Sequence, residues 1–300
     1  MIDEKEIQTM LYLLDDSDER IVEEIQERIK EYGSEVIPIL EKAWPVESNS
    51  KRLERILQLI KEINAKVLCE ELTLWKKTEE QDLLDGVLII DKLYNPLVDK
   101  QLIENQLDKI KLDAWLELKY DLTSFEKIKI LNYIMFDTHQ FKGETDNYHS
   151  SKNSFLSFVL ESKKGNPVSL AVIYAIIAQR LNIPVYGVNL PQHFVLGYVK
   201  DLDWQILSKF NDDAEDEDLE GSEVLFYINP FNSGLIFSKE NIIQFLNQLK
   251  IEVKDSYFTV CSNLDILKRI LRNLLNSYEK EKNEQKLAVV NEMMQILSKE

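Results

Sequence analysis

Two side chains in the stretch from Gly165 to Tyr198 could take part in chemistry, the Ser169 hydroxyl and the His193 imidazole. Gly165-Asn166-Pro167 predicts a turn, and an apolar run to Leu181 predicts a buried helix that begins beside Ser169. A helix N-terminus favours negative charge, so a nucleophile or an oxyanion would be stable there. His193 opens a predicted strand nearby. Both residues also have structural interpretations, Ser169 as a helix cap and His193 as a buried, hydrogen-bonded histidine.

Other potentially reactive groups predict less. His139 and His149 lie ten residues apart in a polar connection with no third ligand nearby, so surface histidines are expected there rather than a zinc site. The acidic segment 211–223 lacks the alternating pattern of calcium loops and is interpreted as a solvated loop between strands. Cys69 and Cys261 fit neither a metal nor a disulfide spacing. No metal and no cofactor are therefore expected.

Charge and composition limit the class of partner. The chain has 300 residues, a formal net charge of −17 and 44% hydrophobic residues, enough for a large core divided into two or three units. Such an acidic chain would be repelled by phosphates, which argues against nucleic acids and anionic membranes as partners. The acidic start and the lack of a long apolar run predict no signal peptide and no membrane span. A cytoplasmic protein is expected.

The first 78 residues have helical periodicity and a possible internal repeat. Shifting the chain by 31 positions superimposes residues 20–44 on residues 51–75 without a gap, and Trp44 then meets Trp75. A period of this size with two helices per unit is typical of stacked helical repeats. We therefore expect a short HEAT-like array of two hairpins, although amphipathic helices can also align by chance.

The rest of the chain predicts a mixed core followed by more helices. Helical patterns continue to Phe136, the strand-like runs are 185–188, 193–198, 224–228 and 235–237, and Ser238 caps a predicted helix at 240–250. Two apolar faces, one from Leu264 to Tyr278 and one from Leu287 to Leu297, predict a C-terminal helical hairpin that resembles one tetratricopeptide (TPR-like) unit.

Several segments together resemble a known family. They are LNYIMFDTHQFKG (131–143), NSFLSFVL (153–160), GNPVSLAVIYA (165–175), NLPQHF (189–194) and FYINPFNSG (226–234). In order and spacing they resemble the SirB-type branch of the transglutaminase-like superfamily, over about Asp82 to Lys250. The resemblance implies a papain-like core with one central helix on an antiparallel sheet and the nucleophile at the start of that helix.

The same resemblance assigns three triad-equivalent positions. Active relatives carry a Cys-His-Asp triad, and here Ser169 stands at the cysteine position, His193 at the histidine and Asn229 at the aspartate. Serine is usual for this branch, whereas Asn229 departs from its aspartate. A serine needs a base supported by a carboxylate, and an amide in that place lowers turnover by about 10⁴ in a well-studied triad. The alternative for Asn229 is a turn residue before Pro230.

These observations predict a mostly helical α+β protein with HEAT-like repeats at 1–78, a transglutaminase-like core at 79–250 and a helical hairpin at 251–300. The state of the triad favours a degenerate, non-catalytic protein (a pseudoenzyme) that binds or regulates another protein or a peptide. The alternative is a slow hydrolase or acyltransferase on peptides or amides, with Ser169 as nucleophile, His193 as base and Asn229 as the orienting group.

Overall fold

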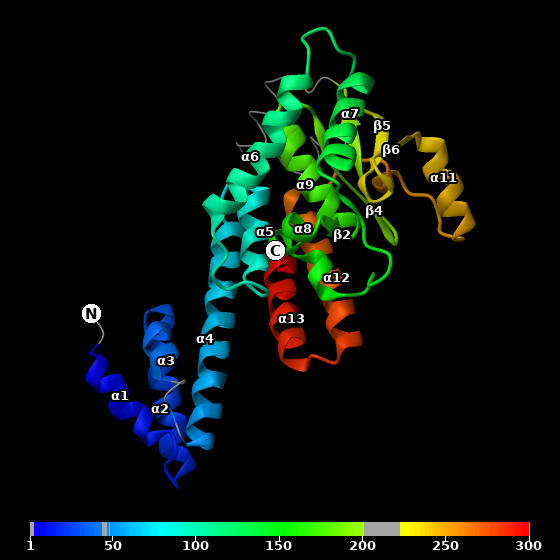
Figure 1. The fold of residues 1–300 in the computed structure, drawn as a ribbon. Coiled ribbons are helices and arrows are strands. Elements are labelled where there is room, and N and C mark those ends of the chain that lie inside the picture. The colour runs from blue at the N-terminus through cyan, green and yellow to red at the C-terminus, as the bar shows by residue number, and fades with distance from the viewer. Residues whose placement is uncertain (1–2, 44–46, 48, 201–222, 300) are drawn as a thin grey trace. The chain divides into compact units, whose positions relative to one another are not determined.

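A computed structural model describes residues 3–43, 47, 49–200 and 223–299. The chain forms two compact units, residues 1–71 and 72–300, which we describe separately (Figure 1). The predicted acidic loop 211–223, apart from Glu223, lies outside the described residues, as does Trp44. None of the helices in the described part of the chain is long and apolar enough to cross a bilayer.

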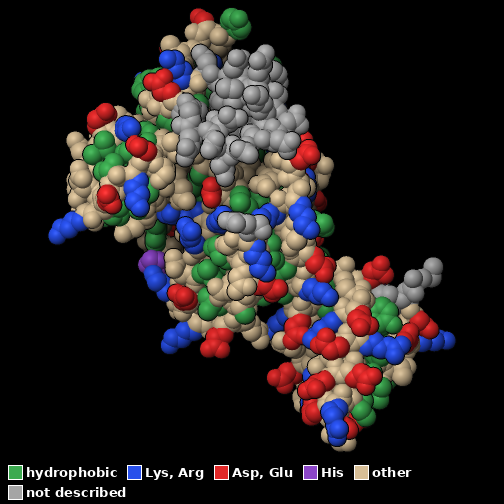
Figure 2. Space-filling model, turned by 180° about the vertical axis from the view of Figure 1, so that it is seen from behind, with side chains coloured by type: hydrophobic (Ala, Val, Ile, Leu, Met, Phe, Trp, Pro, Cys, Tyr) green, Lys and Arg blue, Asp and Glu red, His purple; other side chains and the backbone are tan. Residues whose placement is uncertain are grey.

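The first unit is helical and has one apolar core. Its elements are α1 (Glu4–Leu13), α2 (Glu19–Glu31), the 3-10 turn η1 (Gly33–Val36), α3 (Ile37–Ala43) and the start of α4 (Ser50–Lys76). Ile7, Ile29, Leu40 and Ile56 are buried together in this core. On the surface, acidic and basic side chains are intermingled (Figure 2), and ion pairs such as Arg55 with Glu19 join neighbouring helices.

The second of the two predicted hairpins does not form. Residues 51–75, expected to fold back on themselves, lie within the single helix α4. The position of the turn explains the difference. Gly33, with a φ of +59°, ends the first helix of the real hairpin, but the residue 31 positions later is Asn64 and the next is Ala65, a strong helix former. The aligned apolar positions therefore reflect one long amphipathic helix.

The second unit places helices around a small sheet. The helices before the sheet are α5 (Leu83–Asp91), α6 (Lys100–Glu117), α7 (Ser124–Asn132), the π-helix η3 (Tyr133–Thr138), the 3-10 turn η4 (Ser151–Ser154), α8 (Leu156–Ser162) and α9 (Pro167–Arg180). Those after it are α11 (Lys239–Gln248), the 3-10 turn η7 (Asp255–Tyr257), α12 (Asn263–Glu281) and α13 (Glu284–Ser298). The predicted C-terminal pair of helices corresponds to α12 and α13, which pack against each other.

The main sheet is antiparallel throughout, in the order β3-β4-β5-β6. Its strands are β3 (Val185–Leu190), β4 (His193–Val199), β5 (Val224–Asn229) and β6 (Leu235–Phe237), with the 3-10 turn η6 (Pro230–Asn232) between the last two. Two further strands of two residues each, β1 (Lys142–Gly143) and β2 (Lys164–Gly165), pair in parallel and were not predicted. The predicted α+β, mostly helical fold with a central helix on a small antiparallel sheet is confirmed.

Opposite faces of the main sheet meet different helices. Because strand side chains alternate, His193, Val195 and Val199 share one face, and the last two join a core cluster with Ile242 and Leu246 of α11. The other face of β3 and β4 packs against α9 and α12. The sheet therefore lies between α9 and α11 (Figure 1). Helix α9 is buried on all sides from Pro167 to Ala178, as its composition predicts.

Candidate functional site

The strand-borne part of the predicted triad comes together. His193 begins β4 and Asn229 ends the neighbouring strand β5, and Asn229 Nδ2 lies 3.1 Å from His193 Nε2. The register pairs Leu196 with Ile228, which sets His193 and Asn229 diagonally on the face of the sheet that meets α11. On the same side, the ring of Phe245 in α11 lies 6.2 Å from the His193 ring, centroid to centroid.

The polarity of this contact is fixed by the backbone of the following turn. The N–H groups of Phe231 and Asn232 donate to Asn229 Oδ1, at 3.1 and 3.3 Å. Since an oxygen must occupy that position, the amide nitrogen of Asn229 faces His193 and donates to Nε2. The neutral ring then carries its proton on Nδ1. Asn229 is thus at once the N-cap of η6, as its turn interpretation predicts, and a donor to His193.

Electrostatics favour a neutral His193. Burial lowers the pKa of His193 below its usual value, and the positive charge of Arg269 lowers it further. The guanidinium of Arg269 also holds the chain in place, because it donates to the carbonyl oxygens of Leu190 and His193, at 3.0 and 3.1 Å, and to Asn189 Oδ1 at 2.9 Å. Arg269 therefore fixes the turn between β3 and β4 from α12.

Ser169 lies in the first turn of α9, and its hydroxyl is engaged locally. The Asn166 N–H donates to Ser169 Oγ at 3.0 Å, and the Ser169 N–H donates to Asn166 Oδ1 at 2.9 Å, which completes a capping box. The hydroxyl itself points to the Asn166 carbonyl oxygen, at 3.2 Å. Ser169 is 3% exposed, and across the described residues no hydrogen bond joins it to His193. The structure thus pairs His193 with Asn229 and gives Ser169 a capping partner.

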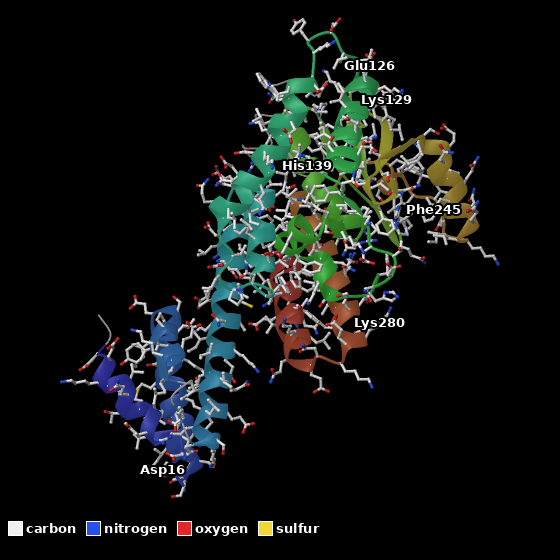
Figure 3. All side chains as sticks on the ribbon, in the orientation of Figure 1. Asp16, Glu126, Lys129, His139, Phe245 and Lys280 are labelled. Atoms are coloured by element: carbon white, nitrogen blue, oxygen red, sulfur yellow. The ribbon has the colours of Figure 1, made fainter. Side chains whose placement is uncertain are left out.

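A cavity borders the His193–Asn229 pair. It has a volume of about 450 Å³ and lies between the sheet and α11, where Figure 3 labels Phe245. Its wall is mainly apolar and includes Leu190, Leu235, Phe237, Ile242 and Phe245. The arrangement can hold an apolar group next to a neutral imidazole; Ser169 is not part of this wall.

The sequence around this site matches the model of a known protein family. The model described as the transglutaminase-like superfamily matches residues 101–272, more than half of the chain. The chain belongs to the transglutaminase-like superfamily. The match runs from α6 into α12 and includes Ser169, His193, Asn229 and Arg269. The predicted domain boundaries at residues 78 and 250 stay predictions.

Curated relatives come from bacteria and animals. A "UPF0162 protein" of Xylella fastidiosa is 32% identical over 152 residues, which are 51% of this chain and 49% of that protein. A "UPF0162 protein" of Vibrio cholerae is 24% identical over 169 residues, 56% of this chain and 53% of that protein. Human "F-box only protein 21" is 24% identical over 223 residues, 67% of this chain and 33% of that protein. The chain thus spans a third to about half of the length of these relatives. No solved structure matches it.

Some residues that position this transglutaminase-like site were missed in the sequence. Arg269 is one cation on the polar side of an amphipathic helix, and no spacing distinguishes it from a solvent-facing residue. Asn132 is a second residue that the sequence analysis missed. Its side-chain Nδ2 donates to the Gly234 carbonyl oxygen at 2.8 Å, and its Oδ1 accepts from the Tyr174 hydroxyl at 3.0 Å. Asn132 joins the end of α7 to α9 and to the turn that follows Asn229.

Proposed function

We propose that this chain is a non-catalytic, SirB-type member of the superfamily that binds another protein or a peptide as a regulatory scaffold. The polarity of the His193–Asn229 contact carries the proposal. In a triad, the third group must accept a hydrogen bond from the ring so that the other ring nitrogen can act as base. Asn229 does the reverse, because its oxygen is held by two backbone N–H groups and its nitrogen faces the ring.

The surroundings of Ser169 support the same proposal. A serine nucleophile must hydrogen-bond to its base and reach the substrate. The Ser169 hydroxyl is buried and bonded to Asn166 instead. The net charge of −17 supports a protein or peptide partner over a nucleic acid or an anionic membrane.

The cavity beside His193 is the proposed contact for the partner. Its apolar wall suits an apolar side chain of a peptide or a protein loop, and the His193 ring and the Asn229 amide lie at the same wall. One edge of the sheet is the short strand β6, whose Leu235 lines the cavity and is 53% exposed. An incoming side chain can therefore reach the cavity past Leu235.

The alternative, a slow hydrolase or acyltransferase, rests on the 3.1 Å contact between His193 and Asn229. A fluorophosphonate separates the two proposals because it labels serines that are activated by a base. We expect no labelling of Ser169 in the wild-type protein. Labelling that is lost in both Ser169→Ala and His193→Ala would make the chain an enzyme. As a second measurement, the Ser169→Cys variant should react with iodoacetamide no faster than the buried Cys69, because position 169 is closed.

A matched pair of variants tests binding. Leu235→Arg places a charged side chain at the cavity, whereas Leu225→Arg changes a leucine of similar exposure, 43%, on the neighbouring strand and outside the cavity. We expect proteins captured from an extract of the source organism to be lost with Leu235→Arg and retained with Leu225→Arg. Identical capture by both variants and the wild type would contradict the proposed binding surface.

A further inference from the structure

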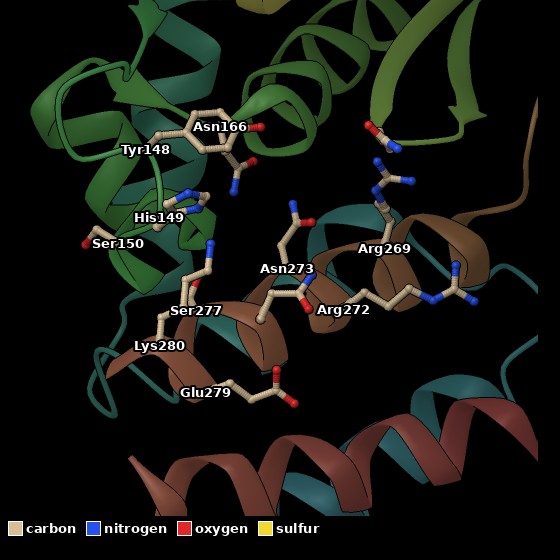
Figure 4. Close-up of a pocket in the computed structure, with 12 residues that line it drawn as sticks. Tyr148, His149, Ser150, Asn166, Arg269, Arg272, Asn273, Ser277, Glu279 and Lys280 are labelled. Carbon is tan, nitrogen blue, oxygen red and sulfur yellow. The ribbon is translucent and has the colours of Figure 1, made fainter. Parts of the chain in front are cut away.

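A second cavity, of about 490 Å³, lies along α12 (Figure 4). Three places in the chain complete its wall: residues 148–150, Asn166 at the N-cap of α9, and Gln192 in the turn before β4. It shares no lining residue with the cavity beside His193. We call it the α12 cavity.

Helix α12 presents its polar side to this cavity. Leu267, Ile270, Leu271 and Leu274 are buried in the core, and the opposite side of the helix carries polar residues at positions 269, 272, 273, 276 and 280. The polar side of an amphipathic helix usually faces bulk water. Here the same side forms one wall of a half-open hollow, with residues 148–150 across from it; Lys280 extends toward these residues and Arg272 extends along the helix (Figure 4).

Positive charge collects in the α12 cavity although the whole chain is acidic. Arg269, Arg272 and Lys280 line it with a single carboxylate, Glu279, which leaves a formal charge of +2 against −17 for the chain. Arg269 is engaged with backbone carbonyl groups and Asn189. Among the described residues, Arg272 and Lys280 have neither an ion pair nor a hydrogen-bond partner.

Neutral donors accompany these cations. The side chains of Asn273 and Asn276 have no hydrogen-bond partner within the described part of the chain, and both line the cavity. His149 lies across from them, and Lys280 extends from α12 in its direction (Figure 4). The N-cap of α9 adds the partial positive charge of a helix N-terminus to the same wall. Guanidinium, ammonium and amide N–H groups together can satisfy several oxygen atoms of one anion.

We infer that the α12 cavity binds a small multivalent oxyanion, that is, a phosphate- or carboxylate-bearing compound of metabolite size. Arg272 and Lys280 supply the charge, and Asn273 and Asn276 supply additional donors. The volume lies within the usual range for small-molecule sites. This binding goes beyond the proposed scaffold function and does not depend on it, because the cavity at His193 is a separate place.

Titration calorimetry of the full chain at low ionic strength tests the inference, with inorganic phosphate and citrate as separate probes. We expect binding of at least one probe with a Kd of roughly 1 mM or lower. Arg272→Gln and Lys280→Gln should each weaken it about tenfold, since each removes a charge-assisted hydrogen bond. Glu279→Gln should strengthen binding, because it removes the single negative charge from the wall.

Lys268→Gln is the matched control. Lys268 lies on the same helix, and its substitution removes the same unit of charge. Its side chain is paired with Asp265 at 3.8 Å and lies outside the cavity wall. Affinity should be unchanged in this variant, and thermal melting checks that every variant is folded. Phosphate binding without citrate binding assigns a phosphate-bearing ligand, and the reverse assigns a carboxylate. Absence of binding by both probes, or equal weakening by Lys268→Gln, would overturn the inference.

Discussion

The two potentially reactive side chains, Ser169 in the first turn of α9 and His193 at the start of β4, have different surroundings. The Ser169 hydroxyl is enclosed by the backbone of Asn166 and is 3% exposed. The His193 ring borders a cavity of about 450 Å³ and has a side-chain partner from another strand. A hydroxyl that closes a helix start contributes to stability, whereas a ring at a cavity wall can contact a ligand. The comparison shows a hydroxyl engaged in a helix cap at one place and an imidazole beside a cavity at the other.

The largest expected effect is at the helix start. Asn166→Ala removes the acceptor for the Ser169 N–H and the donor to Ser154 Oγ at 2.9 Å, and both partners stay buried. We expect a loss of about 3 kcal/mol in the free energy of unfolding. Urea denaturation measures it, with Asp99→Ala as the control. Asp99 caps α6 at an exposed position, and its loss should cost about 1 kcal/mol. Equal losses in the two variants would mean that the buried cap stabilises the protein no more than the exposed cap does.

A second change tests how tightly Ser169 is enclosed. A Cβ at Gly165 would lie 2.6 Å from Ser169 Oγ and 3.0 Å from a Val159 methyl carbon. Gly165→Ala should therefore destabilise the protein by about 2 kcal/mol. In the Ser169→Ala background the same change should cost less, because the closest atom is gone. Denaturation of the four proteins of this double-mutant cycle measures the coupling. A coupling of zero would show that the hydroxyl has space to move, as a nucleophile requires.

At β4, the variant Asn229→Asp sharpens the other half of the comparison. One carboxylate oxygen can accept the hydrogen bonds from the N–H groups of Phe231 and Asn232, and the second oxygen can accept a hydrogen bond from the His193 ring. The charged ring should gain about 1.5 kcal/mol from this hydrogen bond, so the pKa of His193 should rise. NMR titration of the ring protons measures it. An unchanged or lower pKa in Asn229→Asp would mean that the introduced carboxylate does not accept a hydrogen bond from the ring.

The smallest expected effect is a pH dependence of stability. Because the pKa of His193 is lowered by folding, the unfolded chain binds more protons just below the usual histidine value of 6.5, and stability falls as the pH drops through that value. Relative to the wild type, His193→Gln should lose less stability below this pH, by on the order of a few tenths of a kcal/mol. If His193→Gln and the wild type lose stability alike below this pH, the pKa of His193 is not lowered by folding.

Local patterns predicted the central part of the fold well. The apolar run after Pro167 is α9, and the strand-like segments are β3 to β6, because burial and strand alternation are written in neighbouring residues. The diagonal pairing of His193 with Asn229 required more than local pattern, namely the family motif. The register between β4 and β5 then brings together these two side chains, which are 36 residues apart in the sequence.

Other features depend on contacts that no local pattern contains. The two-residue pairing of Lys142 with Lys164 joins segments whose individual patterns do not resemble strands. The continuous helix α4 was predicted as a hairpin because apolar periodicity does not show where a helix ends. The informative position is Asn64, which replaces the helix-ending Gly33 of the first hairpin. The role of Arg269 was hidden for a similar reason. A cation on a polar helix face looks the same in sequence whether it meets water or the carbonyl groups of a turn.

Asn229 is followed by Pro230, and this order of residues affects the deamidation of Asn229. An asparagine usually loses its amide when the backbone nitrogen of the next residue attacks the side-chain carbonyl and closes a five-membered imide, a step that requires that nitrogen to give up its hydrogen. Pro230 has no backbone N–H to lose. The imide route that would turn Asn229 into aspartate, and so place a carboxylate beside His193, is therefore closed by the sequence itself.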